Sequence, residues 1–531
     1  MSSNSNDSST ENNQPKVSKE VHSETTLVGM KVSSSLAENV EMVNKVVGGN
    51  IDLVTRAFSL GRKEALAASI FYIDNLIDTK NIDFNIMQPL LIDSYATGLS
   101  TGSEIVAEIL AGNLITRAQI KKSKNMKELV DGLLVGDAVL LIEGIAEVLI
   151  ISSKGYDYRS VEESNAEPVV KGPRDAFVEV LSVNIGLIRR RIHSPNLVFE
   201  SVKVGKVTQT TVCISYIKGI CSSKLVNEVQ SRINKINIDG ILGSNYIEEF
   251  INDEPFSLFP QIRNTERPDV CCAALLEGRV VIIIDNTPVA LIIPGEFVSL
   301  LQSSEDYYDG YIFSSLIRIL RYFSFAIALT LPAFYIAVSN FHQEMIPTEL
   351  LRTIISSRTG VPLPNIVEAI LMEVTFEILI EAGVRLPKTV GQAVSIVGGL
   401  VIGQSAVQAS LVSPLMVIVV SLTGIATFTI PQYNISHPVR IVRFLLMIVT
   451  AILGLYGLML GLLFMLLHLC SIRSFGIPYL TPLTPLKASD LKDTVIRAPW
   501  WNFSTRPTET SQNKKRMCKP SKPHEGGRNT L

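Results

Sequence analysis

The apolar run at residues 279–294, RVVIIIDNTPVALIIP, predicts a β-hairpin rather than a membrane-spanning helix. A helix needs roughly twenty apolar residues to cross the hydrocarbon core, whereas this run is shorter and is interrupted by Asp285 and Asn286. Its first arm, residues 280–284, consists entirely of β-branched residues, which favour a buried strand. Two such arms around an Asp-Asn turn are typical of a hairpin.

The same pattern occurs twice in the N-terminal half. GDAVLLIEGIAEVLII, from Gly136, aligns without a gap with GRVVIIIDNTPVALII, from Gly278, and each copy starts with a strand-like run, residues 53–60 and 197–204. We expect each copy to continue through a second strand, a helix and the closing hairpin. A chance similarity of valine-rich strands is the alternative, and the gapless match argues against it. The fold class predicted for this half is therefore α/β, with two similar subdomains at residues 39–153 and 195–303.

A connecting arm, residues 154–194, separates the two copies. Asp175 is expected to lead into a helix, and three arginines lie at its C-terminal end, where the helix dipole favours cations. The apolar face predicted for this helix consists of Phe177, Leu181, Ile185 and Ile188. One hypothesis is that Arg189, Arg190 and Arg191 contact acidic lipid headgroups or a neighbouring subunit. The alternative is a helix end that is capped by salt bridges within the chain.

The C-terminal half, residues 311–472, has long apolar stretches that predict an all-α, multi-span membrane domain. Spans are expected at residues 322–340, 391–412, 413–430 and 444–470, the last being the clearest. Arg318 and Arg321 precede the first span and should hold its start inside. Arg385, Lys388, Arg440 and Arg443 are expected in short cytoplasmic loops. A spanning helix at residues 365–388 would make five spans and place the basic C-terminal tail outside, which conflicts with its charge.

Three glutamates make that fifth segment unusual. Glu373, Glu377 and Glu381 are four residues apart, so they stack along one face of a helix. Carboxylates within a membrane face a bundle interior or a water-filled path, and rings of them favour cations. The sequence therefore predicts an ion path, and the alternative is an amphipathic helix that lies in the interface.

The neighbouring predicted span carries small and amide side chains. Gly399 and Gly403 form a GxxxG pair that allows close helix packing. Gln404 and Gln408 must find hydrogen-bond partners in hydrocarbon. We expect the glycines to pack helices together and the glutamines to belong to the wall of the ion path.

Composition limits the function further. Of the 531 residues, 47% are hydrophobic and 18% are charged, and the net charge of −2 excludes a globally basic nucleic-acid binder. We expect two disordered tails, a polar one at residues 1–38 and a basic one at residues 508–531. The first tail lacks the apolar core of a signal peptide, so we expect the N-terminal region to be cytoplasmic. The six cysteines show neither metal-ligand nor disulfide spacing, and the adjacent Cys271 and Cys272 are expected to be packed rather than redox-active.

Four longer segments resemble one known family, the A subunits of the nutrient germinant receptors of bacterial spores. They are EPVVKGPRDAFVEVLSVNIGLIRRRI, FHQEMIPTELLRTIISSRTGVPLP, FEILIEAGVRLPKTVGQAVSIVGGLVIGQSAV and DLKDTVIRAPWW, and the resemblance covers residues 39–507. It implies a cytoplasmic N-terminal region, a multi-pass domain in the spore inner membrane, a transporter-like B subunit and a lipoprotein C subunit as partners, and assembly of the A subunit into an oligomeric cation channel. Trp500 and Trp501 match the family's motif after the membrane domain, in the juxtamembrane segment 473–507, and are expected to anchor at the interface.

The function predicted from these features is a receptor subunit that couples sensing of an amino acid or sugar to ion release. The alternative is a permease-like subunit that itself moves a solute, for which repeats of spans would be expected. An enzyme is the weakest hypothesis, since GxxxxGK[ST] and HExxH are absent and the six histidines are scattered. We therefore expect no catalytic residue, no metal, no cofactor and no nucleic-acid partner; membrane lipids and further copies of the chain are the other expected partners.

Overall fold

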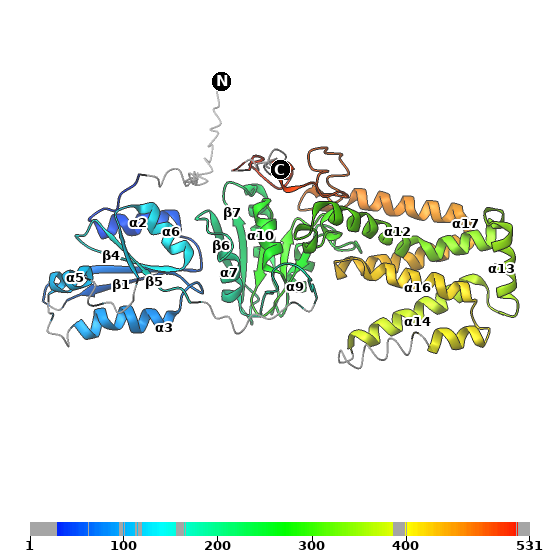
Figure 1. Ribbon diagram of the computed structural model, residues 1–531, viewed down its shortest axis with the longest axis horizontal. Helices are drawn as coiled ribbons and strands as arrows, with labels where there is room; N and C mark the ends of the chain where they lie inside the picture. The colour runs from blue at the N-terminus through cyan, green and yellow to red at the C-terminus, as the bar shows by residue number, and fades with distance from the viewer. Residues whose placement is uncertain are drawn as a thin grey trace, which may run out of the picture. The chain divides into compact units, whose positions relative to one another are not determined.

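The apolar runs of the N-terminal half fold into two five-stranded sheets that have the same strand order (Figure 1). The computed structural model describes residues 29–61, 63–94, 99, 101–111, 114, 119–155, 164, 166–385, 399, 401–516 and 518. The chain divides into two compact units. The first comprises residues 1–48, 54–73 and 79–154, and the second comprises residues 49–53, 74–78 and 155–531.

The first unit contains the sheet with strand order β1-β2-β4-β5-β3. Helix α6 ends at Gly136, whose φ of 93° lies in the left-handed region that glycine adopts without strain, so the chain turns directly into β4. The predicted hairpin is confirmed, because β4 pairs antiparallel with β5. The elements of this half are α2 (Leu36–Val46), β1 (Leu53–Leu60), β2 (Leu66–Ile73), α3 (Thr79–Ile82), the π-helical turns η1 (Asp83–Met87) and η2 (Pro89–Asp93), α5 (Gly102–Ala111), β3 (Ile120–Ser123), α6 (Met126–Val135), β4 (Asp137–Ile142) and β5 (Val148–Ser152).

The second unit begins with the matching sheet, β6-β7-β9-β10-β8. The hairpin predicted at residues 279–294 is confirmed, since β9 and β10 pair antiparallel with Leu291 opposite Ile282. Asn286 in its turn has a φ of 67°, a conformation that Asn tolerates better than most residues. The elements up to the helical region are α7 (Leu181–Arg189), β6 (Leu197–Val204), β7 (Thr210–Ile217), α8 (Ser223–Lys235), α9 (Ser244–Ile251), β8 (Arg263–Thr265), α10 (Pro268–Leu276), β9 (Val280–Ile284), β10 (Ala290–Ile293), α11 (Phe297–Leu300) and the 3-10 helix η4 (Ser304–Tyr307).

Both faces of the second sheet are covered, which explains the continuous apolar strands. Val281 and Ile283 of β9 pack with residues of α7 and α10. Val280, Ile282 and Ile284 pack on the other side with residues of α8 and α9. A strand that is buried on both faces needs apolar residues at every position, not at alternate ones.

Two short strands and several helices were not predicted. β3 has the sequence IKKS and β8 the sequence RNT, and each adds an edge to its sheet. Strands this short and polar carry no apolar periodicity, so only their pairing with β5 and β10 defines them. The second copy also has three helices, α8, α9 and α10, before its hairpin, where one had been expected.

The arm helix α7 begins at Leu181, later than predicted. Phe177 precedes the helix, and its assignment to the apolar face of the helix is wrong, although its side chain is buried. The reason is the side-chain amide of Asn184, which accepts a 2.8 Å hydrogen bond from the N–H of Val178 and donates a 2.6 Å bond to its carbonyl. Because the N–H and the carbonyl of Val178 are bonded to this side chain, the backbone before Leu181 has its hydrogen-bond partners without being helical.

The three arginines at the end of α7 have carboxylate partners within the chain. Arg189 is fully buried, and its Nε and Nη2 donate to the two carboxylate oxygens of Asp52 at 2.9 and 3.1 Å. Arg191 donates to both oxygens of Asp175 at 2.6 Å, and Arg190 lies 3.6 Å from the same carboxylate. The structure therefore matches the salt-bridged alternative for Arg189. A lipid or subunit contact remains an untested prediction for the partly exposed Arg190 and Arg191.

The C-terminal half is helical in the part that the structure describes. Among these residues two helices are long and apolar enough to cross a membrane, α12 and α17, and α16 is apolar but has 15 residues. The span predicted at 391–412 lies largely outside the described residues, of which 399 and 401–408 are helical. The elements are α12 (Tyr311–Phe341), the 3-10 turn η5 (Gln343–Met345), α13 (Thr348–Arg358), α14 (Asn365–Arg385), α16 (Pro414–Phe428) and α17 (Tyr433–Ser471).

The last helix is not the single straight span that was predicted at residues 444–470. Gly454 has a φ of 63° and a ψ of −146°, which breaks α17 into two arms. Gly461 packs so closely on Leu446 that a side chain at Gly461 would collide with it, whereas these residues would be roughly 22 Å apart on a straight helix. The two arms therefore form a helical hairpin, and Figure 1 shows the second arm, in orange, returning toward the second sheet.

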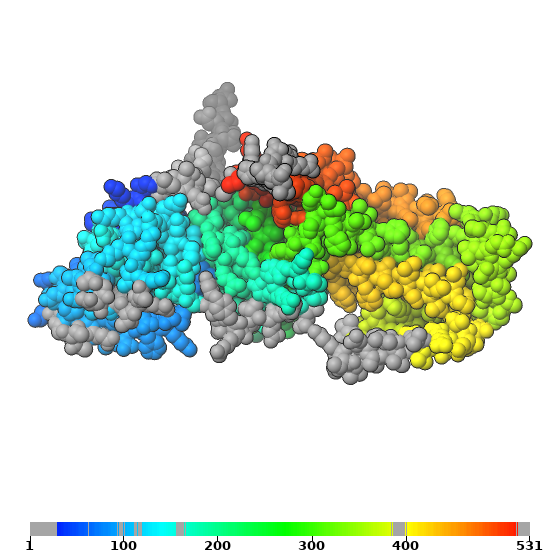
Figure 2. All heavy atoms as spheres, viewed as in Figure 1, coloured from blue at the N-terminus to red at the C-terminus, as the bar shows by residue number. Residues whose placement is uncertain are grey.

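The C-terminal segment after α17 packs back onto the second sheet and the start of α12. Phe297 donates its N–H to the carbonyl of Tyr479 at 2.9 Å, and Gln512 donates to the carbonyl of Ile220 at 2.8 Å. Figure 2 shows the C-terminal segment, in orange and red, spread over the green part of the molecule. The segment contains β11 (Arg473–Ser474), β12 (Ile477–Pro478) and the 3-10 turn η6 (Trp500–Asn502).

The boundaries of the predicted tails need correction. Residues 508–516 belong to the packed segment, where the hydroxyl of Thr510 donates to the carbonyl of Glu277 at 2.8 Å. At the other end, Val32 is buried and Leu36 already starts α2. Residues 1–28, 517 and 519–531 lie outside the described residues.

Loss of one partner of the Asp52–Arg189 pair is expected to be costly. Replacing Asp52 by Ala should leave a buried guanidinium unpaired and lower the free energy of unfolding by about 3–5 kcal/mol. The double variant Asp52→Leu/Arg189→Met should recover much of this stability, since neither side chain is then charged. The measurement is the apparent melting temperature of the full chain in detergent.

The exposed pair Glu349–Arg352 supplies a matched control, because its side chains are 86% and 72% exposed. Glu349→Ala should change stability by no more than about 0.5 kcal/mol. Equal melting temperatures for Asp52→Ala and Glu349→Ala would contradict the assigned role of the buried pair.

Candidate functional site

The glutamate-rich helix α14 packs against the first arm of α17 through matched charges. Glu373 Oε2 lies 3.2 Å from Arg443 Nη2, and Glu377 Oε1 lies 2.7 Å from Arg440 Nη1. Glu381 pairs with Arg385 of its own helix, with 2.7 Å between Oε1 and Nε. The stacking predicted from the four-residue spacing thus produces a row of ion pairs, which we call the glutamate ladder (Glu373, Glu377 and Glu381).

The ladder changes from buried to exposed along α14. The side chain of Glu373 is 1% exposed, that of Glu377 is 38% exposed, and that of Glu381 is 61% exposed. Within the buried pair, Glu373 Oε1 and Arg443 Nε have no hydrogen-bond partner among the described residues. The ladder is therefore buried and incompletely hydrogen-bonded at Glu373, and it is exposed to solvent at Glu381.

Two of the arginines do not lie where the sequence placed them. Arg440 and Arg443 are inside α17 and not in a loop, and both are buried. Arg385 is the last residue of α14, and Lys388 lies outside the described residues. Since an apolar surrounding makes an unpaired charge costly, the carboxylates of α14 are the physical reason that these two arginines can be accommodated in a helix.

The glycines and glutamines of the neighbouring segment do not join the ladder. Gln404 and Gln408 are exposed on their helix. Gly399 and Gly403 border a cavity of about 490 Å³ together with Phe376 and other apolar residues of α14 and α16. No atom lies within 4 Å of where a side chain on Gly399 would begin, so close GxxxG packing at that residue is absent among the described residues. The close approach occurs instead at Gly424, where a side chain would collide with Phe376.

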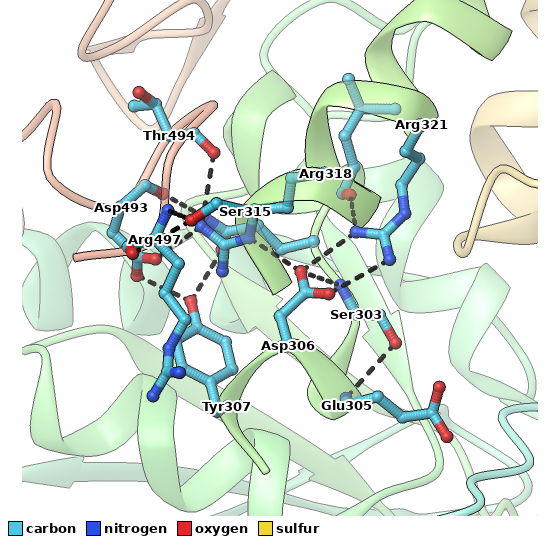
Figure 3. A network of polar contacts seen from close by, with 12 residues as sticks. Ser303, Glu305, Asp306, Tyr307, Ser315, Arg318, Arg321, Asp493, Thr494 and Arg497 are labelled. Carbon is cyan, nitrogen blue, oxygen red and sulfur yellow. Dashed lines mark hydrogen bonds and ion pairs between the residues drawn. The ribbon is translucent and has the colours of Figure 1, made fainter. Parts of the chain in front are cut away.

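A second charged cluster joins the second sheet, α12 and the C-terminal segment, and the sequence did not predict it (Figure 3). Asp306 of η4 accepts from Arg318 Nε at 2.8 Å and from Arg321 Nη1 at 3.0 Å. Arg318 Nη1 also donates to Asp493 Oδ1 at 2.7 Å, and the hydroxyl of Tyr307 donates to Asp493 Oδ2 at the same distance. We call this set the joint cluster (Asp306, Tyr307, Arg318, Arg321 and Asp493).

The joint cluster gives its arginines a structural role, and their expected role of holding the start of the first span inside stays a prediction. α12 is one helix from Tyr311, so Arg318 and Arg321 lie within it and are buried rather than in the flank of a span that starts at residue 322. Their partners are 12 to 175 positions away along the chain. The sequence signal for this cluster is the pair of arginines itself, three residues apart at the edge of an apolar run.

The two tryptophans lie beside the joint cluster. Trp501 packs edge-on against Tyr311, with 5.8 Å between ring centroids, and Trp500 lies 6.0 Å from Tyr307. Trp500 is 52% exposed, and the guanidinium of Arg497 lies 5.1 Å from its ring centroid. These contacts place both rings at the start of α12, and anchoring at a membrane interface remains a prediction.

A cavity of about 240 Å³ lies next to the joint cluster, between α10 and the C-terminal segment. It is lined by Glu277, Arg279, Tyr307, Asp493 and Arg516 among others. Burial raises the pKa of Glu277 to about 7, and the positive charge of Arg279 opposes this shift. Arg279 itself donates to Glu296 at 3.0 Å, so its charge is already shared.

Cys271 and Cys272 occupy packed positions, as predicted. Cys271 and Cys272 are buried on α10, and burial raises the pKa of Cys272 to about 12, which disfavours the reactive thiolate. Among the described residues no three His, Cys, Asp or Glu side chains are grouped so as to hold a metal ion.

Comparison with known proteins decides the family. The family model described as "Bacillus/Clostridium GerA spore germination protein" matches residues 41–509. The chain belongs to this GerA family. Spore germination protein KA of Bacillus subtilis (strain 168) is 45% identical over 493 residues, which are 93% of this chain and 90% of that protein. Spore germination protein GerLA of Bacillus cereus is 36% identical over 92% of this chain and 98% of its own length.

One solved structure is also similar to the GerA-family chain. It is the crystal structure of the N-terminal domain of the A subunit of the Bacillus megaterium spore germinant receptor GerK3, which is 34% identical. The match covers 50% of this chain and 98% of the solved one, with a TM-score of 0.40.

The buried step of the glutamate ladder is expected to tolerate exchange of its charges but not loss of pairing. Glu373→Arg alone or Arg443→Glu alone should place like charges together and cost about 3 kcal/mol or more. The double exchange should restore a pair and recover part of that loss. The loss and recovery of stability are measured by the amount of folded chain in membranes and by its melting temperature in detergent. A double exchange that is no more stable than the worse single variant would refute direct pairing.

Glu277 is expected to make stability depend on pH. Its folded-state pKa of about 7 lies above the value of about 4.3 of an exposed glutamate, so the folded state holds the proton more tightly. The resulting stabilisation is complete below about pH 4 and is lost as pH rises toward and through 7. Glu277→Gln should remove this part of the pH dependence and raise the melting temperature at pH 8. An unchanged pH profile for Glu277→Gln would contradict the raised pKa.

Proposed function

We propose that this GerA-family chain is a membrane-spanning subunit of a spore germination receptor and that its oligomer releases cations when a nutrient is sensed. The observation that carries the proposal is the glutamate ladder, whose exposure rises from 1% at Glu373 to 61% at Glu381. Acidic side chains that become progressively open to solvent along one helix are what the mouth of a cation path requires.

We infer that the chain crosses the membrane six times. The crossing segments are α12, α14, the helix that includes residues 401–408, α16 and the two arms of α17. Contacts at their ends support alternating directions. At one end Phe341 packs on Gly454, and Asn365 donates to Ser339 at 2.7 Å. At the other end Gln432 donates to Glu167 at 2.8 Å, and His468 lies 3.1 Å from Ser257.

An even number of crossings agrees with the contacts of the C-terminal segment. That segment is hydrogen-bonded to the second sheet, so both lie on one side of the membrane, and the basic character of residues 508–531 favours the cytoplasm. The five spans expected from the sequence gave the opposite side. The difference arises at Gly454, where one predicted span becomes two arms.

The carboxylates of the ladder differ in whether they could face water in a channel. In this chain each carboxylate of the ladder has a guanidinium within 3.2 Å, so the row as a whole is close to neutral. Glu377 and Glu381 are the members exposed enough to face water in a homo-oligomer, and Glu373 would hold α14 against α17. The resemblance to germinant receptor A subunits supports a transporter-like B subunit and a lipoprotein C subunit as partners, in the spore inner membrane.

One observation favours the second candidate, a permease-like subunit. The cavity of about 490 Å³ between α14 and α16 is large enough for a small solute. Its lining is largely apolar, with Met372, Phe376, Val417 and Phe428, and it offers few groups that would recognise a polar nutrient. The channel therefore remains the better-supported proposal.

Cation flux through the chain reconstituted alone in liposomes tests the proposal. Glu377→Gln should lower K⁺ flux, because it removes a partly exposed negative charge from the path, whereas Arg440→Gln should not lower it, because the carboxylate of Glu377 is then freed. Both variants break the same ion pair, so a purely structural role would reduce flux in both to a similar extent.

Glu349→Gln is the matched control, since this glutamate is 86% exposed on α13 and lies outside the ladder. It should leave flux unchanged. Wild-type flux and cation selectivity in a variant with Gln at all three ladder positions would refute the assignment of the ladder to the path.

A further inference from the structure

The loop at residues 252–260, NDEPFSLFP, holds an exposed apolar side chain in a fixed position. Phe256 is 99% exposed, and Leu258, two residues later, is 47% exposed. Phe250 of the preceding helix α9 is 52% exposed. Single exposed apolar residues are common, but here three of them lie within nine positions of the chain, at residues 250, 256 and 258.

The loop is held by side-chain hydrogen bonds to its backbone. Gln261 is 2% exposed, and its Oε1 accepts from the N–H groups of Asp253 and Glu254 at 3.0 Å. Its Nε2 donates to the carbonyl of Glu254 at 2.7 Å. Phe259, at the other end of the loop, is buried in the core that the helical region forms. The position of Phe256 is therefore set before any partner binds, and binding would not have to order the loop.

The loop lies against the end of the second arm of α17. The hydroxyl of Ser257 is 3.1 Å from Nε2 of His468, and the ring of Phe259 lies 6.2 Å from the His468 ring. His468 is in the last turn of this arm, which ends at Ser471. Phe256 and Leu258 are the sequence neighbours of Ser257, so they lie at the level where the apolar arm ends.

We infer that Phe256 and Leu258 insert into the interfacial layer of the same bilayer that α17 crosses. The inference rests on the proposed crossing of the second arm of α17. The end of a membrane-crossing helix lies at the interface, and aromatic side chains are favoured at that depth. Arg473 is exposed two residues after the arm ends, so it is placed to meet lipid phosphates there. The loop has two acidic side chains, of which Asp253 is paired with Arg232 and Glu254 is exposed without an ion-pair partner among the described residues.

Lipid is favoured over a protein partner by this continuity with the apolar arm. Phe464, four residues before His468, is 68% exposed, so the apolar surface of the arm leads toward the loop. The second subdomain would thus be fixed to the membrane at two points, by its covalent link to α12 and by this loop. A subdomain held at two points cannot swivel freely about the start of α12.

A spin label at residue 256 tests the inference in the full chain. The variant Phe256→Cys is made with Cys470→Ser and Cys518→Ser, because these two native cysteines are exposed. The labelled chain is placed in nanodiscs of phosphatidylcholine and phosphatidylglycerol. Collisions of the label with oxygen, which concentrates in the bilayer, are compared with collisions with a water-soluble nickel chelate. We expect the ratio of oxygen to nickel accessibility to be several-fold higher at residue 256 than at an exposed control residue.

Val207→Cys is that control, since Val207 is 79% exposed in the turn between β6 and β7, at the edge of the sheet opposite β8. A ratio at residue 256 equal to that at residue 207 would overturn the inference, because the loop would then be in water. Exclusion of both reagents from residue 256 would also overturn it and would indicate a covering protein or a second copy of the chain. Phe464→Cys separates this result from the proposed crossing, because a water-accessible label there would mean that the arm itself is not in the membrane.

Discussion

Arg318 and Arg321 sit inside a 31-residue apolar helix, where an unpaired guanidinium would cost several kcal/mol, and this requirement for partners organises the centre of the molecule. Asp306 meets both arginines from the short helix after the second sheet. Asp493 meets Arg318 from the C-terminal segment. The consecutive elements η4 and α12 are thus held at one point with the C-terminal segment, which is 175 residues away along the chain at Asp493, and separating them would leave a buried charge unpaired.

This constraint gives the second sheet a mechanical connection to α12. The sheet is packed on both faces, and the short helix η4 that follows it carries Asp306. The C-terminal segment adds a second connection through the hydrogen bonds of Tyr479 and Gln512. The second sheet is therefore connected to α12 through Asp306 and through the chain itself, and to the hairpin of α17 through the segment that follows Ser471.

The glutamate ladder satisfies the same physical rule in a different way. The joint cluster is multiply bonded around Asp306 and Asp493, although Arg318 Nη2 has no partner among the described residues. The ladder has one buried step with unsatisfied atoms at Glu373 and Arg443, and two steps that are increasingly open to solvent. Pairs that are incompletely hydrogen-bonded and partly exposed gain less from their contact, so they are the weaker link between helices.

Local sequence pattern alone predicted the closing hairpin of each sheet, because a strand buried on both faces must be apolar throughout and the gapless match of GDAVLLIEGIAEVLII to GRVVIIIDNTPVALII marks the same hairpin twice. The short edge strands β3 and β8 carry no such pattern and are defined only by their pairing. The stacking of Glu373, Glu377 and Glu381 was also predicted, since it follows from helical periodicity. Their partners were not, because Arg440 and Arg443 become neighbours of these carboxylates only when α17 packs on α14. Gly454 shows the same limit: glycine permits both a continuous helix and a turn, and the packing of Gly461 on Leu446 and of Phe341 on Gly454 selects the turn. The joint cluster depends on Asp493, 175 residues from Arg318, and only the tertiary fold decides contacts at such separations.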